Sequence, residues 1–229
     1  MEPALAAHPF IELPDYDRVP GTAAGSAPGS MLLVHGFGGD KNQLRELGDA
    51  LCPAGSAAFY PSLRAHGASP KPIWGYSVLD FAADLHRIAD VFPQEIHAVG
   101  YSYGALVSAI SATTWGARRI RSLVVIDQSF AAHPEEHEVD EWVEGSLLRW
   151  HYDFTHMLDL LQLLEVPVLV LASPDSGTIS PAEEKELLAR QSPLLTYRHI
   201  SGSHATCYRD TPHLTGLIAD FYRSLPAAG

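Results

Sequence analysis

The stretch Ile96-His97-Ala98-Val99-Gly100-Tyr101-Ser102-Tyr103-Gly104 joins a short apolar run to a serine that stands between two glycines. Residues 96–100 have the length and composition of a buried strand, and residues 103–114 have the apolar character of a helix. A strand, a G-x-S-x-G turn and a helix in this order are typical of a sharp turn that exposes a nucleophilic serine. The two glycines remove Cβ atoms that would collide in such a turn. We therefore expect Ser102 to be a nucleophile held above the edge of a sheet.

Strands and helices alternate on both sides of this turn. Strands are expected at residues 8–13, 31–34, 56–60, 122–126, 166–172 and 194–200, and helices at residues 41–51, 78–91, 181–190 and 211–224. Residues 20–30, which are rich in Gly, Pro, Ser and Ala, are expected to form a flexible connection. Alternation of this kind predicts an α/β fold with a mostly parallel central sheet and helices on both faces.

Residues 128–165 interrupt the alternation, because they lie between two strands yet have a helical pattern. An insertion at the carboxyl end of a strand lies over the ligand site of an open α/β sheet, so we interpret this segment as a short helical cap. The core would then comprise residues 1–127 and 166–229. Trp142 and Trp150 suit an apolar wall over the substrate, although they would equally suit packing of the cap on the core. An ordinary solvated helix pair is the alternative to a cap.

The charge balance excludes several classes of partner. The chain of 229 residues carries 15 Lys and Arg against 27 Asp and Glu, a net charge of −12. A surface this acidic repels phosphate backbones and anionic lipids, so we expect neither nucleic acid nor a membrane as a partner. The sequence has no secretory signal pattern, no apolar run of roughly 18 residues, and too few cysteines for a disulfide framework. These features predict a cytoplasmic protein.

A glycine-rich motif, His35-Gly36-Phe37-Gly38-Gly39, follows the expected strand at 31–34. Glycines at such a place let the backbone approach a ligand oxygen. We predict that the N–H groups of Phe37 and Tyr103 form an oxyanion hole. A phosphate-binding loop is disfavoured, because the spacing matches neither the dinucleotide nor the P-loop pattern. Three further residues of the two glycine motifs are expected to contact the substrate: His35, Gly36 and Tyr101.

The motif Gly202-Ser203-His204 lies between the last expected strand and the last expected helix. A histidine on that loop can reach across the sheet edge to Ser102 and serve as its general base. Residues 133–137 also match H-x-x-E-H, a zinc-peptidase signature, but Pro134 suits only the start of a helix and no partner motif follows. We expect neither a metal nor an organic cofactor.

Along the chain, the glycine-rich motif at 35–39 comes first, the G-x-S-x-G turn at 100–104 second and the histidine motif at 202–204 last. In kind and in order, these motifs resemble those of the α/β-hydrolase fold superfamily. The resemblance runs from His35 to His204 and through the last helix. Residues 61–69 (PSLRAHGAS) are similar to the family's D-x-R-G-H-G-x-S loop, with Ser62 and Ala65 in place of two usual residues. The serine at position 102 argues against the members of the family that attack with an aspartate.

The resemblance leaves the triad acid open. The family usually carries its acid on the loop after the penultimate core strand, and counting back from Pro181 places Gly177 there, which has no side chain. Two aspartates are candidates. Asp175 lies on the same loop, and Asp127 follows the preceding strand, where some members of the family carry their acid. We favour Asp127, because a residue at the end of a central strand is held rigidly and the acid must fix the tautomer of the histidine.

The resemblance implies a serine hydrolase of the carboxylesterase or thioesterase kind. Ser102 would cleave an ester or thioester of a small to medium substrate through an acyl-enzyme, and an acyl-carrier protein is a candidate partner. Two alternatives remain. A lyase or cyclase on the same fold would use His204 for proton transfer, and a non-catalytic module would bind a small molecule without reaction.

Overall fold

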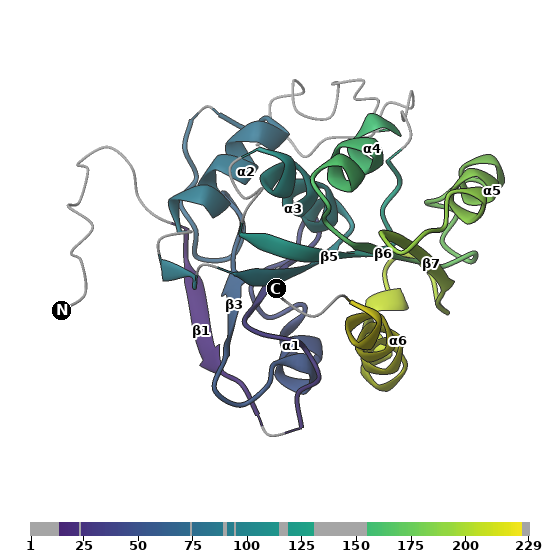
Figure 1. The fold of residues 1–229 in the computed structure, drawn as a ribbon. Coiled ribbons are helices and arrows are strands. Elements are labelled where there is room, and N and C mark those ends of the chain that lie inside the picture. Colours follow the sequence, from purple (N-terminus) through teal and green to yellow (C-terminus); the bar gives the residue numbers. More distant parts are fainter. Residues whose placement is uncertain are drawn as a thin grey trace.

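The computed structural model describes residues 14–22, 24–73, 75–88, 91–93, 95–114, 119–130 and 155–225. Within these ranges seven strands form one sheet in the order β1-β3-β2-β4-β5-β6-β7 (Figure 1). The strands are β1 (Tyr16–Pro20), β2 (Met31–Val34), β3 (Ala57–Pro61), β4 (Ile96–Tyr101), β5 (Ile120–Ile126), β6 (Val168–Ala172) and β7 (Leu195–His199). Only the β1–β3 pair of this sheet is antiparallel.

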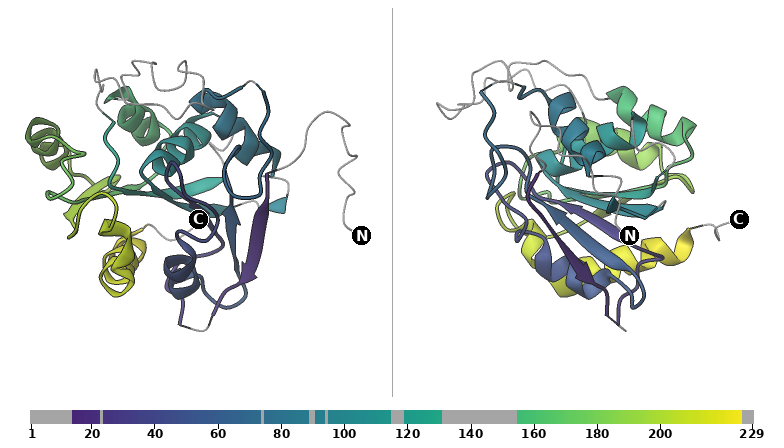
Figure 2. Two further views of the ribbon diagram at one scale, coloured as in Figure 1. Left: turned by 180° about the vertical axis from the view of Figure 1, so that it is seen from behind. Right: turned by 90° about the vertical axis from the view of Figure 1, so that its left-hand side faces the viewer.

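Helices cover both faces of the sheet, as the alternation predicts. They are α1 (Arg45–Leu51), α2 (Val78–Arg87), α3 (Tyr103–Thr113), α4 (Thr155–Leu163), α5 (Pro181–Ala189) and α6 (Thr211–Ser224). The views in Figures 1 and 2 place α1 and α6 on one face and α2, α3 and α4 on the other. The expected α/β class, with a mostly parallel sheet between two layers of helices, is therefore confirmed.

Residues of the central strands alternate between two apolar clusters, and this alternation accounts for the layers. In β5, Leu123 and Val125 face the cluster that contains α2 and α3, whereas Val124 and Ile126 face the cluster that contains α1 and α6. Successive side chains of a strand point to opposite faces, so an uninterrupted apolar strand buries both faces at once. This is why the strands read as continuous apolar runs in the sequence.

Helix starts follow from capping residues. Ser77 and Asp80 form a capping box at the start of α2, and the Ser180 side chain accepts a hydrogen bond from the Glu183 N–H ahead of Pro181 in α5. Such side chains satisfy N–H groups that have no partner within the helix.

The N-terminal edge differs from the expectation. Residues 8–13, for which a strand was expected, lie outside the described residues, and the edge strand β1 is found at Tyr16–Pro20. The sequence of β1, YDRVP, contains no apolar run that would indicate a buried strand. Asp17 pairs with both Lys41 and Arg45, which ties this edge strand to the start of α1.

The carboxyl end of the expected cap is described, and it packs on the core. Helix α4 lies against α3, with Leu158 and Leu161 buried in the same cluster as the sheet. Residues 131–154, which include Trp142 and Trp150, lie outside the described residues. The cap with bounds 128–165 therefore stays a prediction.

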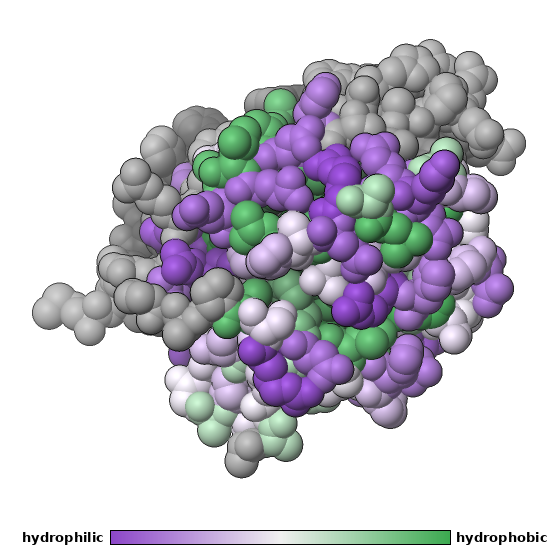
Figure 3. All heavy atoms as spheres, turned by 45° about the vertical axis from the view of Figure 1, so that its right-hand side comes forward, coloured by the Kyte–Doolittle hydropathy of each residue, from purple (hydrophilic) through white to green (hydrophobic). Residues whose placement is uncertain are grey.

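The face that carries β7, α5 and α6 shows apolar side chains in separate areas between hydrophilic ones (Figure 3). Among the exposed large apolar residues are Leu160 and Leu163 of α4, Leu164 just after it, and Leu188 of α5. Among the helices of the described ranges, none has both the length and the apolar character that a bilayer crossing demands.

Candidate active site

Strands β4, β5 and β6 are neighbours that end at the same edge of the sheet, where Ser102 follows β4 and Asp127 follows β5. The Ser102 N–H, just after β4, donates to the Ile126 carbonyl at 2.9 Å, and the Asp127 N–H, just after β5, donates to the Leu171 carbonyl of β6 at 2.7 Å. Because the carboxyl ends of parallel strands meet at the same edge, these hydrogen bonds place a serine and an aspartate side by side.

The serine occupies the tight turn that its motif predicts. Ser102 has φ 50° and ψ −128°, a backbone conformation that residues with a Cβ rarely adopt. A Cβ on Gly104 would lie closer than 3.0 Å to the backbone oxygens of Val34 and His35. Glycine at this position therefore lets α3 approach β2, and this approach brings the two glycine-rich motifs together.

A chain of hydrogen bonds joins the serine, the histidine and one aspartate. His204 Nε2 lies 2.9 Å from Ser102 Oγ, and His204 Nδ1 lies 2.7 Å from Asp127 Oδ2. An ionised carboxylate only accepts, so Nδ1 carries the proton and Nε2 is left to accept from the serine hydroxyl. This is the tautomer that a general base for Ser102 requires.

The Asp127 carboxylate is fully buried. Burial acts to raise the pKa of Asp127, but the hydrogen bonds from His204, Ser173 and Ser176 outweigh burial, and the pKa lies below its usual value. The side chain is therefore an anion at neutral pH, as the partner of an imidazolium must be.

The second candidate acid lies elsewhere. Asp175 is exposed, whereas the partners of the His204 ring nitrogens among the described residues are Ser102, Asp127 and Thr178. Gly177, at the position where an acid was expected, has φ 68° and open space around its Cα. Of the two aspartates left open by the sequence, Asp127 is the one that contacts the histidine.

Tyr101 contacts the histidine, and its expected contact with substrate stays a prediction. Its side chain is buried, and its hydroxyl donates to the backbone carbonyl of His204. Burial raises the pKa of Tyr101 above its usual value, so the hydroxyl stays protonated and remains a donor. The thiol of Cys207 lies 3.5 Å from the same carbonyl, and burial raises the pKa of Cys207 to about 12, which leaves a neutral thiol.

His35 and Gly36 make hydrogen bonds within the protein, and their expected contact with substrate stays a prediction. The buried His35 ring accepts from the Leu63 N–H at Nε2 (2.9 Å) and donates from Nδ1 to the Gly36 carbonyl (2.7 Å). The Gly36 N–H donates to Gln43 Oε1 at 2.8 Å. Both residues therefore use their polar groups to hold the loop. A Cβ on Gly36 would meet the Tyr101 ring at 2.8 Å, so glycine allows this close approach.

Phe37 and Tyr103, whose N–H groups are the predicted oxyanion donors, lie beside each other. Tyr103 is the first residue of α3, and its ring meets that of Phe37 edge-on with centroids 6.2 Å apart. The Phe37 side chain is partly exposed and also contacts the His66 ring. The oxyanion hole itself stays a prediction that this placement favours.

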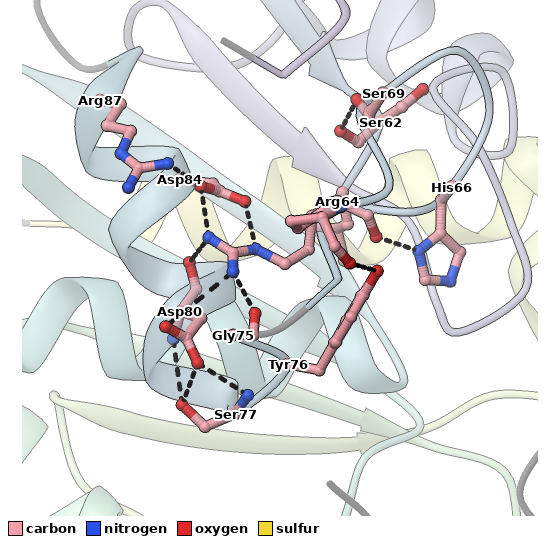
Figure 4. A network of polar contacts seen from close by, with 12 residues as sticks. Ser62, Arg64, His66, Ser69, Gly75, Tyr76, Ser77, Asp80, Asp84 and Arg87 are labelled. Atoms are coloured by element: carbon pink, nitrogen blue, oxygen red, sulfur yellow. Dashed lines mark hydrogen bonds and ion pairs between the residues drawn. The ribbon is translucent and has the colours of Figure 1, made fainter. Parts of the chain in front are cut away.

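The loop of residues 61–69 holds the glycine-rich loop through His66, whose contact with the Arg64 carbonyl is drawn in Figure 4. His66 accepts a hydrogen bond from the Gly38 N–H at Nε2 (3.0 Å) and lies 2.8 Å from the Arg64 carbonyl through Nδ1. Burial lowers the pKa of His66 and favours the neutral ring that this pattern of one donor and one acceptor needs. The glycine motif is thus fastened to residues 61–69 by two imidazoles, those of His35 and His66.

Arg64 anchors the loop of residues 61–69 to α2. Its guanidinium makes two hydrogen bonds to the Asp84 carboxylate (2.6 and 2.7 Å) and also donates to the carbonyls of Gly75 and Asp80 (Figure 4). Two parallel bonds to one carboxylate fix orientation as well as distance. Ala65 stands where the similar family motif D-x-R-G-H-G-x-S has a glycine. Its φ of 61° is a backbone conformation that favours glycine.

Three residues of the site were missed in the sequence: Ser173, Ser176 and Thr178. Each donates a hydrogen bond to Asp127 from the loop that follows β6. A signal was available in the loop itself, since residues 173–178 (SPDSGT) concentrate hydroxyl groups next to the empty acid position. In the part of the chain that the structure describes, no cluster of three or more His, Cys, Asp or Glu could hold a metal ion.

The comparisons identify the family of this chain. The model of the alpha/beta hydrolase fold family matches residues 29–158, more than half of the sequence. The chain belongs to this family. No protein in the curated collection matches.

Solved structures share the fold at low identity. An esterase from Thermogutta terrifontis is 20% identical with a TM-score of 0.68 and covers 91% of this chain and 92% of its own. The thioesterase domain of the curacin biosynthetic pathway is 16% identical with a TM-score of 0.65 and covers 89% and 93%. A haloalkane dehalogenase variant from Bradyrhizobium elkanii is 15% identical with a TM-score of 0.61 and covers 91% and 92%. These enzymes differ in chemistry, so the likeness concerns the fold alone.

The close approach at Gly104 predicts a large loss of stability on substitution. We expect Gly104→Ala to lower the free energy of unfolding by about 3 kcal/mol, because the added methyl group meets backbone atoms that cannot rotate away. Gly216, exposed within α6 and with open space around it, is the control, and Gly216→Ala should raise the free energy by about 0.5–1 kcal/mol. Urea denaturation measures both, and equal effects would contradict the packing described for α3.

Buried neutral histidines predict acid sensitivity. Burial lowers the pKa of His35 and of His97 to about 4, so in the folded protein both stay neutral while the unfolded chain takes up protons. The unfolded state thus binds more protons between pH 6.5 and 4, and stability falls as the pH falls through this window, by about 3 kcal/mol for each group. Urea denaturation from pH 7 to 4 measures the fall. His97→Gln should make it shallower, and an unchanged free energy of unfolding in the wild type would contradict the prediction.

Proposed function

We propose that this protein is a serine hydrolase that cleaves an ester or thioester of a small to medium-sized substrate through an acyl-enzyme at Ser102. One observation carries the proposal, namely the unbroken hydrogen-bonded chain from Ser102 Oγ through the His204 ring to the buried carboxylate of Asp127. Membership of the alpha/beta hydrolase fold family supports the same reaction class.

In the first half of the reaction, Ser102 Oγ attacks the carbonyl carbon of the substrate while His204 Nε2 takes the hydroxyl proton. The Asp127 carboxylate stabilises the imidazolium that forms. The N–H groups of Phe37 and Tyr103 are proposed to bind the oxyanion of the tetrahedral intermediate. His204 then gives its proton to the leaving alcohol or thiol, and the acyl group stays on Ser102.

In the second half, a water molecule loses a proton to His204 Nε2 and attacks the acyl carbonyl. The intermediate collapses, Ser102 Oγ recovers a proton from His204, and the carboxylic acid leaves. The protein's own groups suffice for both halves, and the cycle consumes one water for each bond cleaved.

The leaving group decides between two substrate classes. Among the solved structures with this fold are an esterase and a thioesterase domain of a biosynthetic pathway. An acyl-carrier protein with a thioester-linked acyl group is the candidate partner if the thioester is the natural substrate. Parallel assays with p-nitrophenyl esters and with acyl thioesters of a small thiol compare the two classes directly.

Hydrolysis stands ahead of the lyase or cyclase reading for a specific reason. A lyase or cyclase would be favoured if no acid accompanied the histidine, as Gly177 at the usual acid position suggested. The contact of Asp127 with His204 argues that an acid is available from the end of β5. The mass of the product discriminates between them, because a hydrolase adds water and a cyclase does not.

Labelling of the nucleophile is the first test. We expect a fluorophosphonate probe to add once to the intact protein at Ser102, because an activated serine attacks phosphorus as it attacks a carbonyl, and Ser102→Ala to abolish the adduct. Intact-mass measurement with peptide mapping gives the answer. A folded wild-type protein that takes up no probe would contradict the proposal and favour a binding module.

The acid is tested by a matched pair. Asp127→Asn should lower kcat/KM on the order of 10³–10⁴-fold, because an amide cannot hold the histidine in its working tautomer and charge state. Asp175→Asn, on the exposed part of the next loop, should leave kcat/KM unchanged. Equal losses of kcat/KM in the two variants would contradict the assignment of Asp127 as the acid.

Tyr101 should act through the position of His204. Tyr101→Phe removes only the hydroxyl that donates to the His204 carbonyl, and we expect kcat to fall about 3- to 10-fold with KM unchanged. Tyr222→Phe is the control, because this buried hydroxyl has no partner among the described residues. Steady-state kinetics of both variants measure the difference, and a change in KM alone for Tyr101→Phe would instead favour a contact with substrate.

A further inference from the structure

We propose that the loop of residues 173–178 orients the triad acid, with Ser176 and Thr178 as positioning residues that act through Asp127. The inference rests on the proposed function and extends it. The residues concerned lie where the similar family motif carries its acid, and here they surround an acid that comes from another strand.

Four hydrogen bonds reach the Asp127 carboxylate, and the neutral thiol of Cys207 also lies against it. Oδ1 accepts from the Ser173 N–H (3.0 Å) and from the Ser176 hydroxyl (2.9 Å). Oδ2 accepts from His204 Nδ1 (2.7 Å) and from the Thr178 hydroxyl (3.2 Å). A carboxylate offers about four acceptor sites, and the histidine with three donors from one loop matches that number.

The loop is itself held in place. The Ser176 N–H donates to the Ser173 carbonyl (3.1 Å), and the Thr178 N–H donates to Ser176 Oγ (3.1 Å). The Ser173 hydroxyl donates to the carbonyl of Gly202, two residues before His204. One short segment therefore connects the end of β6, the carboxylate and the loop of the histidine.

Ser176 has a choice of acceptors. Ser176 Oγ lies 2.9 Å from Asp127 Oδ1 and 2.8 Å from the Ser173 carbonyl oxygen, so its hydroxyl can donate to either. A charged acceptor forms the stronger hydrogen bond, so the carboxylate takes the proton. Thr178 Oγ1 also lies 3.1 Å from His204 Nδ1, which places this hydroxyl against both members of the acid–base pair.

The donors have two effects of known sign. They fix the plane of the carboxylate, which keeps the imidazole in line with Ser102. They also neutralise part of the negative charge, which weakens the hold of Asp127 on the imidazolium. Removal of a donor should therefore lower kcat and, because the freer carboxylate favours the protonated imidazole, move the acid limb of the kcat/KM profile to higher pH.

The test uses four variants of the full chain. For Thr178→Val and for Ser176→Ala we expect kcat to fall about 3- to 10-fold and the acid limb of kcat/KM to move up by about half a pH unit, with p-nitrophenyl acetate as substrate. Thr178→Ser keeps the hydroxyl and should restore the wild-type profile. Ser180→Ala is the structural control, because Ser180 caps α5 and lies outside the set of donors to Asp127.

If the hydroxyl groups had a structural role alone, Thr178→Val, Ser176→Ala and Ser180→Ala would all have lower melting temperatures. The pH profile of kcat/KM would then stay as in the wild type. Such a result, with Ser176→Ala and Thr178→Val behaving as Ser180→Ala does, would overturn the inference. So would a failure of Thr178→Ser to restore the profile.

A second measurement separates this inference from the proposed function. NMR titration of the His204 imidazole follows its protonation in the free protein, whether or not any ester is cleaved. We expect its midpoint to rise in Thr178→Val and in Ser176→Ala. If the wild type takes up no fluorophosphonate yet this midpoint rises, the proposed hydrolysis fails and the positioning role stands. An unmoved midpoint overturns the positioning role in an active or an inactive protein.

Discussion

The hydrogen-bonded register of β4, β5 and β6 is the constraint on which the site depends. Ser102 and Asp127 each come directly after a strand. Their N–H groups continue the hydrogen bonding of the sheet, since they donate to the carbonyls of Ile126 and Leu171. The spacing of neighbouring strands is about 4.8 Å, so the separation of Ser102 and Asp127 is a property of the sheet. His204 is the one member of the three that a loop must bring into place, and Tyr101, Cys207 and Thr178 all contact it.

Two neutral imidazoles connect the glycine motif after β2 to the loop after β3. His35 and His66 each accept one backbone N–H and lie in hydrogen-bond contact with one carbonyl, a pattern that an imidazolium could not maintain because it has no acceptor. The Arg64–Asp84 pair carries the same connection on to α2. The loop that carries the predicted oxyanion donor Phe37 is thus held by hydrogen bonds with His35 and His66.

Much of this arrangement could be predicted from the sequence, because local patterns report it. Apolar runs and glycine turns located the parallel strands, and the order of the motifs singled out Ser102, His204 and two aspartates. The roles of His35 and Tyr101 could not be read in the same way, since a motif does not reveal which face of the turn a side chain takes. The sequence did not reveal the donors to Asp127, because they lie on a loop about 50 residues further along the chain. It did not reveal β1 either, because this edge strand has polar side chains, one of which forms ion pairs.

Backbone conformation at these loops has a consequence for how the protein can change. Ala65, Ser102 and Asp127 are three of the four non-glycine residues with positive φ in the described part of the chain, and all three lie in the loops of the site. A left-handed conformation costs a residue with a Cβ about 1–2 kcal/mol, and glycine escapes this cost. At Ser102, whose hydroxyl contacts only His204 among the described residues, selection for thermal stability alone would therefore favour glycine. At Asp127 glycine would leave the donors of residues 173–178 unpaired, which opposes the gain. If Ser102 is the nucleophile as proposed, the side chain that stability selects against is the one that turnover requires.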